Sequence, residues 1–123
     1  MTGTEKNIPL AVYGTLRKGY RNYYRYLRDS EHLGTFTTRN RYRLVLTDYP
    51  SVLPFNGEGQ RIEIDLFLVD ANTLHSIDRL EGHPDLYYRS RVFLSNGTQA
   101  WMYLRDIPDT GRHLSRFSDR NLG

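Results

Sequence analysis

The sequence predicts an α+β fold in which a small, curved and mostly antiparallel sheet is flanked by short helices. Apolar and polar side chains alternate along residues 61–69, which is the period of a strand with one buried face. Residues 71–80 carry apolar side chains at helical spacing. Residues 95–98 have the sequence Ser-Asn-Gly-Thr, and Asn-Gly favours the type I′ turn of a β-hairpin. This mixture of a hairpin, a half-buried strand and a short helix indicates the α+β class.

Seven elements follow from periodicity and turn signals. We expect strands at residues 9–13, 41–47, 61–69, 89–95 and 99–105, and helices at residues 20–29 and 71–80. Gly14 ends the first strand, and one face of the first helix is formed by Tyr20, Tyr23, Tyr24 and Leu27. Asp70 or Asn72 caps the second helix, which Gly82 ends. The hairpin pairs residues 91–94 with residues 99–104.

Length and composition predict a single domain, residues 1–123. Its core is expected at about 9–105, and residues 106–123 have little periodicity and are expected to form a loose tail. The chain contains no cysteine, which excludes disulfides and a thiolate nucleophile. No apolar run is long enough to span a membrane, and the first residues lack a signal-peptide pattern. We therefore expect a cytoplasmic protein that does not insert into membranes.

The ionisable residues give no metal or cofactor signature. The four histidines, His32, His75, His83 and His113, lack metal-ligand spacing, so we expect no metal site and no organic cofactor. His83 is expected to be a turn residue, and a pair with Glu81, two residues away, is the alternative. We also expect the carboxylates of Glu63 and Asp65 to point to opposite faces of their strand, and therefore not to form a pair.

The segment Leu80-Glu81-Gly82-His83-Pro84 places an acid where the helical pattern calls for an apolar residue. Glu81 follows Leu74 by seven residues and Ile77 by four, so it projects from the same inward face. Desolvation and the negative end of the helix dipole both raise the pKa of such a carboxyl. A raised pKa suits a general acid or base near neutral pH. The alternative is a frayed helix end with Glu81 in solvent.

A strand, a glycine turn and a helix follow one another over residues 9–29. This order leaves backbone N–H groups free to bind an anion at the turn. The segment has neither the spacing of a P-loop nor that of a dinucleotide-binding fingerprint. A turn without any binding role is the alternative interpretation.

Two motifs together resemble the gamma-glutamylcyclotransferase-like family, which includes gamma-glutamylamine cyclotransferases and AIG2-like proteins. They are Val12-Tyr13-Gly14-Thr15-Leu16-Arg17 and Ile77-Asp78-Arg79-Leu80-Glu81-Gly82-His83-Pro84. Shorter matches are Gly19, Asn22, Leu33-Gly34, Tyr49-Pro50, Tyr87, Arg89 and Ala100-Trp101-Met102-Tyr103. The resemblance covers about residues 9–105. Relatives often carry Gly-Glu where this chain has Ile64-Asp65, so one wall of the expected pocket differs in bulk.

The resemblance implies both a fold and a reaction. The sheet is expected to close into a small barrel with a pocket at its mouth. The reaction is the cyclisation of a γ-glutamyl amide or peptide to 5-oxoproline with release of an amine, and it requires no cofactor. Glu81 is the expected general acid and base. The expected substrate-binding residues are Tyr13, Gly14, Thr15, Leu16 and Tyr87. For Tyr87 the alternative is a core ring with a satisfied hydroxyl, and Arg89 is expected in a structural ion pair.

Two other functions remain open from the sequence. One is a non-catalytic module of the same fold that binds another small anionic ligand. The other is a basic protein that contacts nucleic acid or an acidic partner through its tail and the helix face of Arg21, Arg25 and Arg28. The formal net charge is only +3 and the arginines are scattered, so we do not expect nucleic acid to be the partner. The sequence carries no indication of an oligomeric state.

Overall fold

The structure, a computed structural model, describes residues 5–110, 112–114 and 116, and contains two curved sheets and two helical segments. One sheet has the order β2-β5-β1-β7-β6, formed by β1 (Ile8–Val12), β2 (Glu31–Thr37), β5 (Glu63–Val69), β6 (Tyr88–Phe93) and β7 (Gln99–Leu104). The other has the order β4-β3-β8, formed by β3 (Leu44–Leu46), β4 (Pro50–Val52) and β8 (Arg112–Leu114). Of the strand pairs in the described residues, β1–β7 is parallel and the rest are antiparallel. The predicted α+β class with a mostly antiparallel sheet is confirmed.

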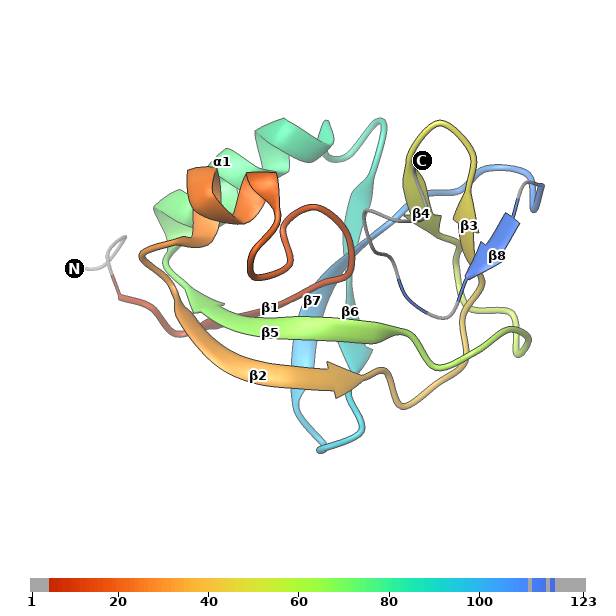
Figure 1. The fold of residues 1–123 in the computed structure, drawn as a ribbon, viewed down its shortest axis with the longest axis horizontal. Helices are drawn as coiled ribbons and strands as arrows, with labels where there is room; N and C mark the ends of the chain where they lie inside the picture. The colour runs from red at the N-terminus through yellow and green to blue at the C-terminus, as the bar shows by residue number, and fades with distance from the viewer. Residues whose placement is uncertain (1–4, 111, 115, 117–123) are drawn as a thin grey trace.

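The expected closure of the sheet into a barrel is wrong. Within the described residues, the edge strands β2 and β6 meet only at their last residues, next to a bridge between Thr38 and Leu94. The Ser95 N–H donates to the Thr37 carbonyl at 2.8 Å there, and the Arg39 N–H donates to the Phe93 carbonyl at 2.8 Å. Past this point the chain leaves the first sheet and builds the second one, beside the end of β2 and the start of β5 (Figure 1). The sheet is therefore curved and open.

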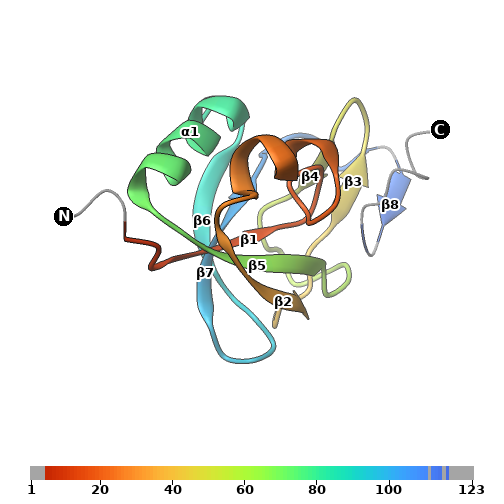
Figure 2. The same ribbon diagram turned by 60° about the vertical axis from the view of Figure 1, so that its left-hand side comes forward.

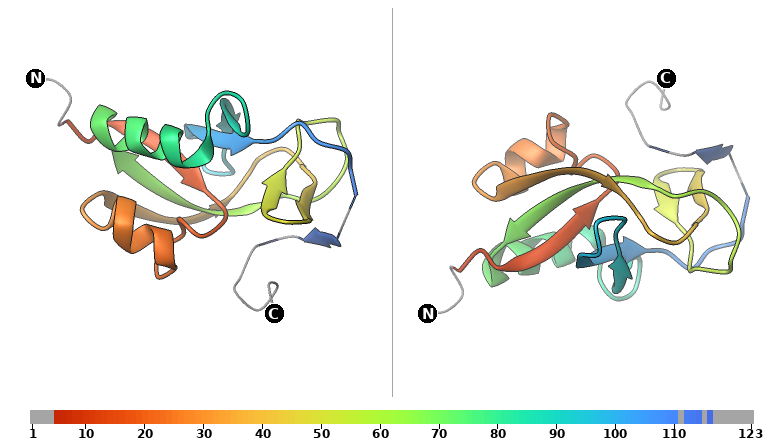
Figure 3. Two further views of the ribbon diagram at one scale, coloured as in Figure 1. Left: turned by 90° about the horizontal axis from the view of Figure 1, so that it is seen from above. Right: turned by 90° about the horizontal axis from the view of Figure 1, so that it is seen from below.

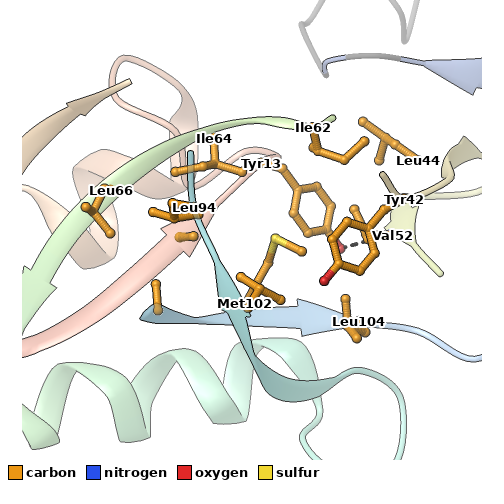
Figure 4. Packing of buried hydrophobic residues seen from close by; sticks show 13 residues of the cluster. Tyr13, Tyr42, Leu44, Val52, Ile62, Ile64, Leu66, Leu94, Met102 and Leu104 are labelled. Carbon is orange, nitrogen blue, oxygen red and sulfur yellow. Dashed lines mark hydrogen bonds between the residues drawn. The ribbon is translucent and has the colours of Figure 1, made fainter. Parts of the chain in front are cut away.

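Both faces of the five-stranded sheet are buried, whereas the alternation in residues 61–69 predicted one buried face. Ile64 and Leu66 of β5 belong to a core on the concave face, which is shown in Figure 4. Phe67 and Val69, on the opposite face of the same strand, belong to a second core. The helical segments cover this second face (Figures 2 and 3). The strand is confirmed, but the expectation of one buried face is wrong, because Phe67 is buried on the side that was expected to face solvent.

The helix α1 (Ala71–Glu81) begins and ends where the sequence predicts. Asp70 is the N-cap, and its Oδ1 accepts a hydrogen bond from the Thr73 N–H at 2.7 Å. Gly82 follows the helix in the left-handed conformation, with φ of 68°, which glycine adopts without steric cost. The inward residues Leu74 and Ile77 are buried in the second core. This packing fixes the rotation of the helix, and with it the direction of its last residue.

The first helix is shorter and wider than predicted. Within residues 20–29, Arg21 and Asn22 are α-helical and continue into one π-helical turn, η1 (Tyr23–Leu27). Leu27 is fully buried, as expected, but Tyr24 is 56% exposed. A π-turn has i→i+5 hydrogen bonds, so it rotates positions away from the face that a 3.6-residue period assigns to them. A helical segment is therefore present where the sequence predicts one, but the placement of Tyr24 on its inner face is wrong.

The hairpin between β6 and β7 joins the predicted segments, but through a different turn. Val92 pairs with Ala100, within a ladder that runs from Tyr88 and Leu104 to Phe93 and Gln99. No described residue other than glycine has a positive φ, and in this turn Gly97 has φ of 88°. A type I′ turn would need a positive φ at Asn96 as well. The turn is instead a three-residue loop ending in a left-handed glycine.

Three strands were not predicted from the sequence. One of them lies in residues 106–123, which were expected to form a loose tail. β2, β4 and β8 are short or polar, and β8 lies at residues 112–114, where it pairs with β3. Tail residues 111, 115 and 117–123 lie outside the described part of the chain. The strand expected at 41–47 is reduced to β3, with Tyr42 forming a separate bridge to Gln60.

Candidate active site

A cavity of about 410 Å³ lies between the turn that follows β1, the end of α1 and the segment that leads into β4. All six residues that the sequence singles out line it: Tyr13, Gly14, Thr15, Leu16, Glu81 and Tyr87. They come from three separate parts of the chain, and the fold brings them to one place. A volume of this size is typical of a pocket for a small molecule.

The turn after β1 presents backbone donors to the cavity. The Arg17 N–H donates to the Gly14 carbonyl at 3.0 Å, and the Asn22 N–H donates to the Thr15 carbonyl at 3.1 Å. The Asn22 side chain also donates to the Thr15 hydroxyl at 2.7 Å. The N–H groups of Gly14, Thr15 and Leu16 donate to no acceptor within the described residues. The turn is therefore held by its carbonyls and one hydroxyl, and its first N–H groups remain free to bind a ligand.

A buried carboxylate on β5 holds the other side of this turn. Asp65 accepts hydrogen bonds from the Lys18 N–H at 2.8 Å, from the Thr35 hydroxyl at 2.8 Å and from the Arg17 guanidinium at 3.3 Å. Burial raises the pKa of Asp65, but the hydrogen bonds from Thr35 and Arg17 outweigh it and lower this pKa below its ordinary value. Asp65 is therefore a charged anchor for the turn.

Arg17 also corrects the expectation that Glu63 and Asp65 point to opposite faces of their strand. Its Nη2 lies 2.8 Å from Glu63 Oε2 and 3.3 Å from Asp65 Oδ1. Residues two apart in a strand share a face, so one guanidinium bridges both carboxylates. The two acids form a structural cluster with Arg17 behind the turn, and neither lines the cavity.

Glu81 is the last residue of α1, and its side chain lines the cavity. Burial raises the pKa of its carboxyl to about 7. No described residue donates a hydrogen bond to this carboxyl or forms an ion pair with it. An acid in this state exchanges a proton readily near neutral pH, because neither of its forms is held by a partner.

The end of α1 is fixed one turn before Glu81. Asp78 accepts a hydrogen bond from the Tyr103 hydroxyl at 2.6 Å and binds both Nε and Nη2 of Arg89, at 2.8 and 3.2 Å. Arg89 therefore has the structural ion pair that the sequence predicted. His83 Nδ1 accepts from the Arg89 N–H at 3.3 Å, which is consistent with the expected role of His83 in the turn.

The two tyrosines contribute their rings and backbone to the cavity, because their hydroxyls are engaged elsewhere. Tyr87 donates to the Pro50 carbonyl at 2.9 Å and lies 3.2 Å from the Ser51 hydroxyl. Tyr13 donates to the Tyr103 carbonyl at 2.9 Å and accepts from the Val52 N–H at 3.2 Å. Figure 4 shows the Tyr13 ring among the side chains of the concave core. Both hydroxyls thereby hold the β4 segment in place at the edge of the cavity.

Several further residues line the cavity without having been predicted as site residues: Arg21, Asn22, Asp48, Tyr49, Pro50 and Leu86. Asn22 and Tyr49-Pro50 carried a signal, since they match short motifs of the family that the chain resembles. Arg21 had been assigned only to a basic helix face. Its place beside the cavity follows from the tight turn at residues 14–22, which periodicity alone does not predict.

The described residues contain no group of three or more His, Asp or Glu side chains that would hold a metal ion. Within the same residues, no helix has the length and apolar character needed to cross a membrane.

Residues 10–119 match the family described as "Gamma-glutamyl cyclotransferase, AIG2-like". The chain belongs to this family. The resemblance seen in the two sequence motifs is confirmed, and so is the enzyme class, a cyclotransferase.

Individual relatives agree with this assignment. A putative gamma-glutamylcyclotransferase of Methanocaldococcus jannaschii is 38% identical over 99 residues, which cover 75% of this chain and 79% of that protein. Gamma-glutamylaminecyclotransferase B of Danio rerio is 38% identical over 95 residues, covering 71% of this chain and 50% of that protein. The crystal structure of an AIG2-like protein from Mus musculus superposes with a TM-score of 0.82, at 21% identity over 93% of this chain and 90% of that chain. At that identity the superposition supports the fold alone.

Proposed function

We propose that this cyclotransferase converts a γ-glutamyl amide or peptide into 5-oxoproline and a free amine, with Glu81 as the general acid and base. The proposal rests on one observation above all. A carboxyl with a pKa of about 7 and no described partner lines the same cavity as three unengaged backbone N–H groups.

Ring closure needs no nucleophile from the protein. Glu81 takes a proton from the α-ammonium of the substrate, and the resulting α-amine attacks the γ-carbonyl carbon to form the ring C–N bond. Glu81 then gives this proton to the leaving nitrogen, and the original amide C–N bond breaks. The ring nitrogen loses its second proton through the regenerated Glu81 carboxylate to the released amine, which departs as an ammonium. Both transfers suit a single carboxyl whose pKa lies near the working pH. Holding the substrate in its folded shape supplies much of the rate, because attack is intramolecular.

The turn after β1 supplies the complementary positive potential. The N–H groups of Gly14, Thr15 and Leu16 are available for the α-carboxylate of the substrate and for the oxyanion that develops on the γ-carbonyl. Preorganised backbone donors stabilise such an oxyanion without reorganisation. The rings of Tyr13 and Tyr87 bound the cavity, so that part of the substrate is shielded from water.

The test is a panel of γ-glutamyl amides and dipeptides incubated with the protein. We expect 5-oxoproline and the free amine to appear in equal amounts for at least one member. Free glutamate in place of 5-oxoproline would indicate hydrolysis by water, and tight binding without any turnover would indicate a ligand-binding module. Either result would contradict the proposed reaction.

A further inference from the structure

Three of the described residues that line the cavity carry ionisable charge: Glu81, Asp48 and Arg21. Glu81 has the proton-transfer role proposed above. Asp48 is occupied, since its Oδ1 accepts from the Thr47 hydroxyl and the Tyr49 N–H, both at 2.8 Å, and pairs with Arg105 at 3.1 Å. Its negative charge is therefore compensated by the protein.

Arg21 is the unmatched charge of this set. Arg21 is an exposed residue that lines the cavity, and its guanidinium forms no ion pair or hydrogen bond with any residue in the described ranges. Its backbone is held beside the turn, because its neighbour Asn22 bonds to both the carbonyl and the hydroxyl of Thr15. Arg21 is thus attached to a fixed part of the site, with a long side chain and a free charge.

The γ-glutamyl group does not require this charge. It carries one ammonium, which faces Glu81 in the proposed reaction, and one carboxylate, which the free N–H groups of the turn can bind. The cavity, at about 410 Å³, has room for more than the five-membered ring. The remaining positive charge therefore fits a second negative charge on the substrate, in the part that leaves.

We infer that Arg21 is a specificity-determining residue that binds a carboxylate on the leaving amine, so that γ-glutamyl conjugates of amino acids are preferred over those of uncharged or cationic amines. This inference rests on the proposed function. A guanidinium binds a carboxylate through charge-assisted hydrogen bonds. Asp48 offers no compensating preference for a cationic amine, because Arg105 already neutralises it.

The test compares γ-glutamyl-alanine with γ-glutamyl-ethylamide, which differ only by the carboxylate on the leaving amine. For the wild-type protein we expect kcat/KM to be about tenfold higher for γ-glutamyl-alanine, the worth of a charged hydrogen bond. Arg21→Gln should abolish this preference by lowering kcat/KM for the alanine conjugate alone. Arg21→Lys should retain part of it. Arg25→Gln is the matched control, since Arg25 is an exposed arginine of η1 that does not line the cavity.

Each other result overturns the inference in a recognisable way. An equal loss on both conjugates would assign Arg21 to the α-carboxylate that they share. No loss on either, or no preference in the wild-type protein, would remove Arg21 from substrate recognition while leaving the cyclisation intact. Failure of the wild-type protein to cyclise either conjugate, with turnover of another γ-glutamyl amide of the panel, would overturn this inference alone. Failure on the whole panel would overturn the proposed function as well.

Discussion

The pKa of Glu81 is raised by the burial of its carboxyl at the end of α1. Such a carboxyl has a definite effect on stability. Its pKa is about 7 in the folded protein against an ordinary value of 4.5. Between these values the folded state binds more protons than the unfolded state, so the free energy of unfolding falls as the pH rises through this window. Above pH 7 the free energy of unfolding has lost the full amount that the buried carboxylate costs.

Glu81→Gln should therefore be more stable than the wild-type protein at neutral and alkaline pH. The difference in the free energy of unfolding should reach about 2–3 kcal/mol at pH 8, because each pKa unit corresponds to about 1.4 kcal/mol. It should shrink towards zero near pH 4.5. Urea unfolding of both proteins across this range measures it. Two curves that stay parallel from pH 4.5 to 8 would mean that Glu81 is solvated.

At the scale of the elements, the turn after β1 depends on a carboxylate that never touches the cavity. Asp65→Asn keeps the size of the side chain but removes the charge that holds Arg17 and the Lys18 N–H. We expect kcat/KM to fall about tenfold or more, because small displacements of positioning groups are costly. Steady-state kinetics of the variant measure this.

The matched control for Asp65 is Glu63→Gln. Glu63 also binds Arg17 but makes no contact with the backbone of the turn in the described structure. Its kcat/KM should stay within about threefold of wild type, as expected for a half-exposed ion pair. Equal losses in both variants would show that the Arg17 cluster acts on overall stability and does not position the turn.

The end of α1 is a second element on which the site depends. Gly82 has φ of 68°, and a Cβ added there would lie 3.0 Å from Leu86 Cβ. Gly82→Ala should destabilise the protein by about 1–2 kcal/mol through left-handed strain and should also reduce turnover, since the shifted helix end carries Glu81. Gly97→Ala is the control. Gly97 has φ of 88° and open space around it, so the same strain should lower stability without affecting turnover.

At the scale of the whole molecule, one hydroxyl joins the two sheets next to the site. Tyr13 links the β7 carbonyl of Tyr103 to the β4 N–H of Val52. Tyr13→Phe should cost about 1–3 kcal/mol of unfolding free energy, because a buried N–H loses its acceptor. Denaturant titration measures the loss. A stability within about 0.5 kcal/mol of wild type would mean that water or a small shift replaces the hydroxyl.

The sequence predicted best those features that depend on local rules. The cap by Asp70, the end of the helix at Gly82 and the β6–β7 hairpin follow from neighbouring residues. Features that depend on distant partners were not predicted from the sequence. β2 pairs with β5 across a separation of some 30 residues, and β8 is a strand only because β3 lies beside it. Whether the sheet closes also depends on distant partners, because β2 and β6 are far apart in the sequence.

The same distinction between local features and features with distant partners applies to the site. The two motifs predicted that Glu81 and the turn at Gly14 belong to one pocket, and the fold places both in one cavity. The sequence did not predict that the hydroxyl of Tyr87 is engaged by Pro50, or that Arg21 lines the cavity. Both depend on how the segment before β4 and the π-turn η1 pack in three dimensions, which no local pattern encodes.

The most direct test of the proposed mechanism is the rate of 5-oxoproline formation by Glu81→Gln at saturating substrate. Gln keeps the size of the side chain but cannot take up the proton of the α-ammonium. We predict that kcat falls by about 100-fold or more, the usual worth of a positioned acid–base group, while KM changes little. Turnover within about threefold of wild type would contradict the assignment of Glu81 as the catalytic group.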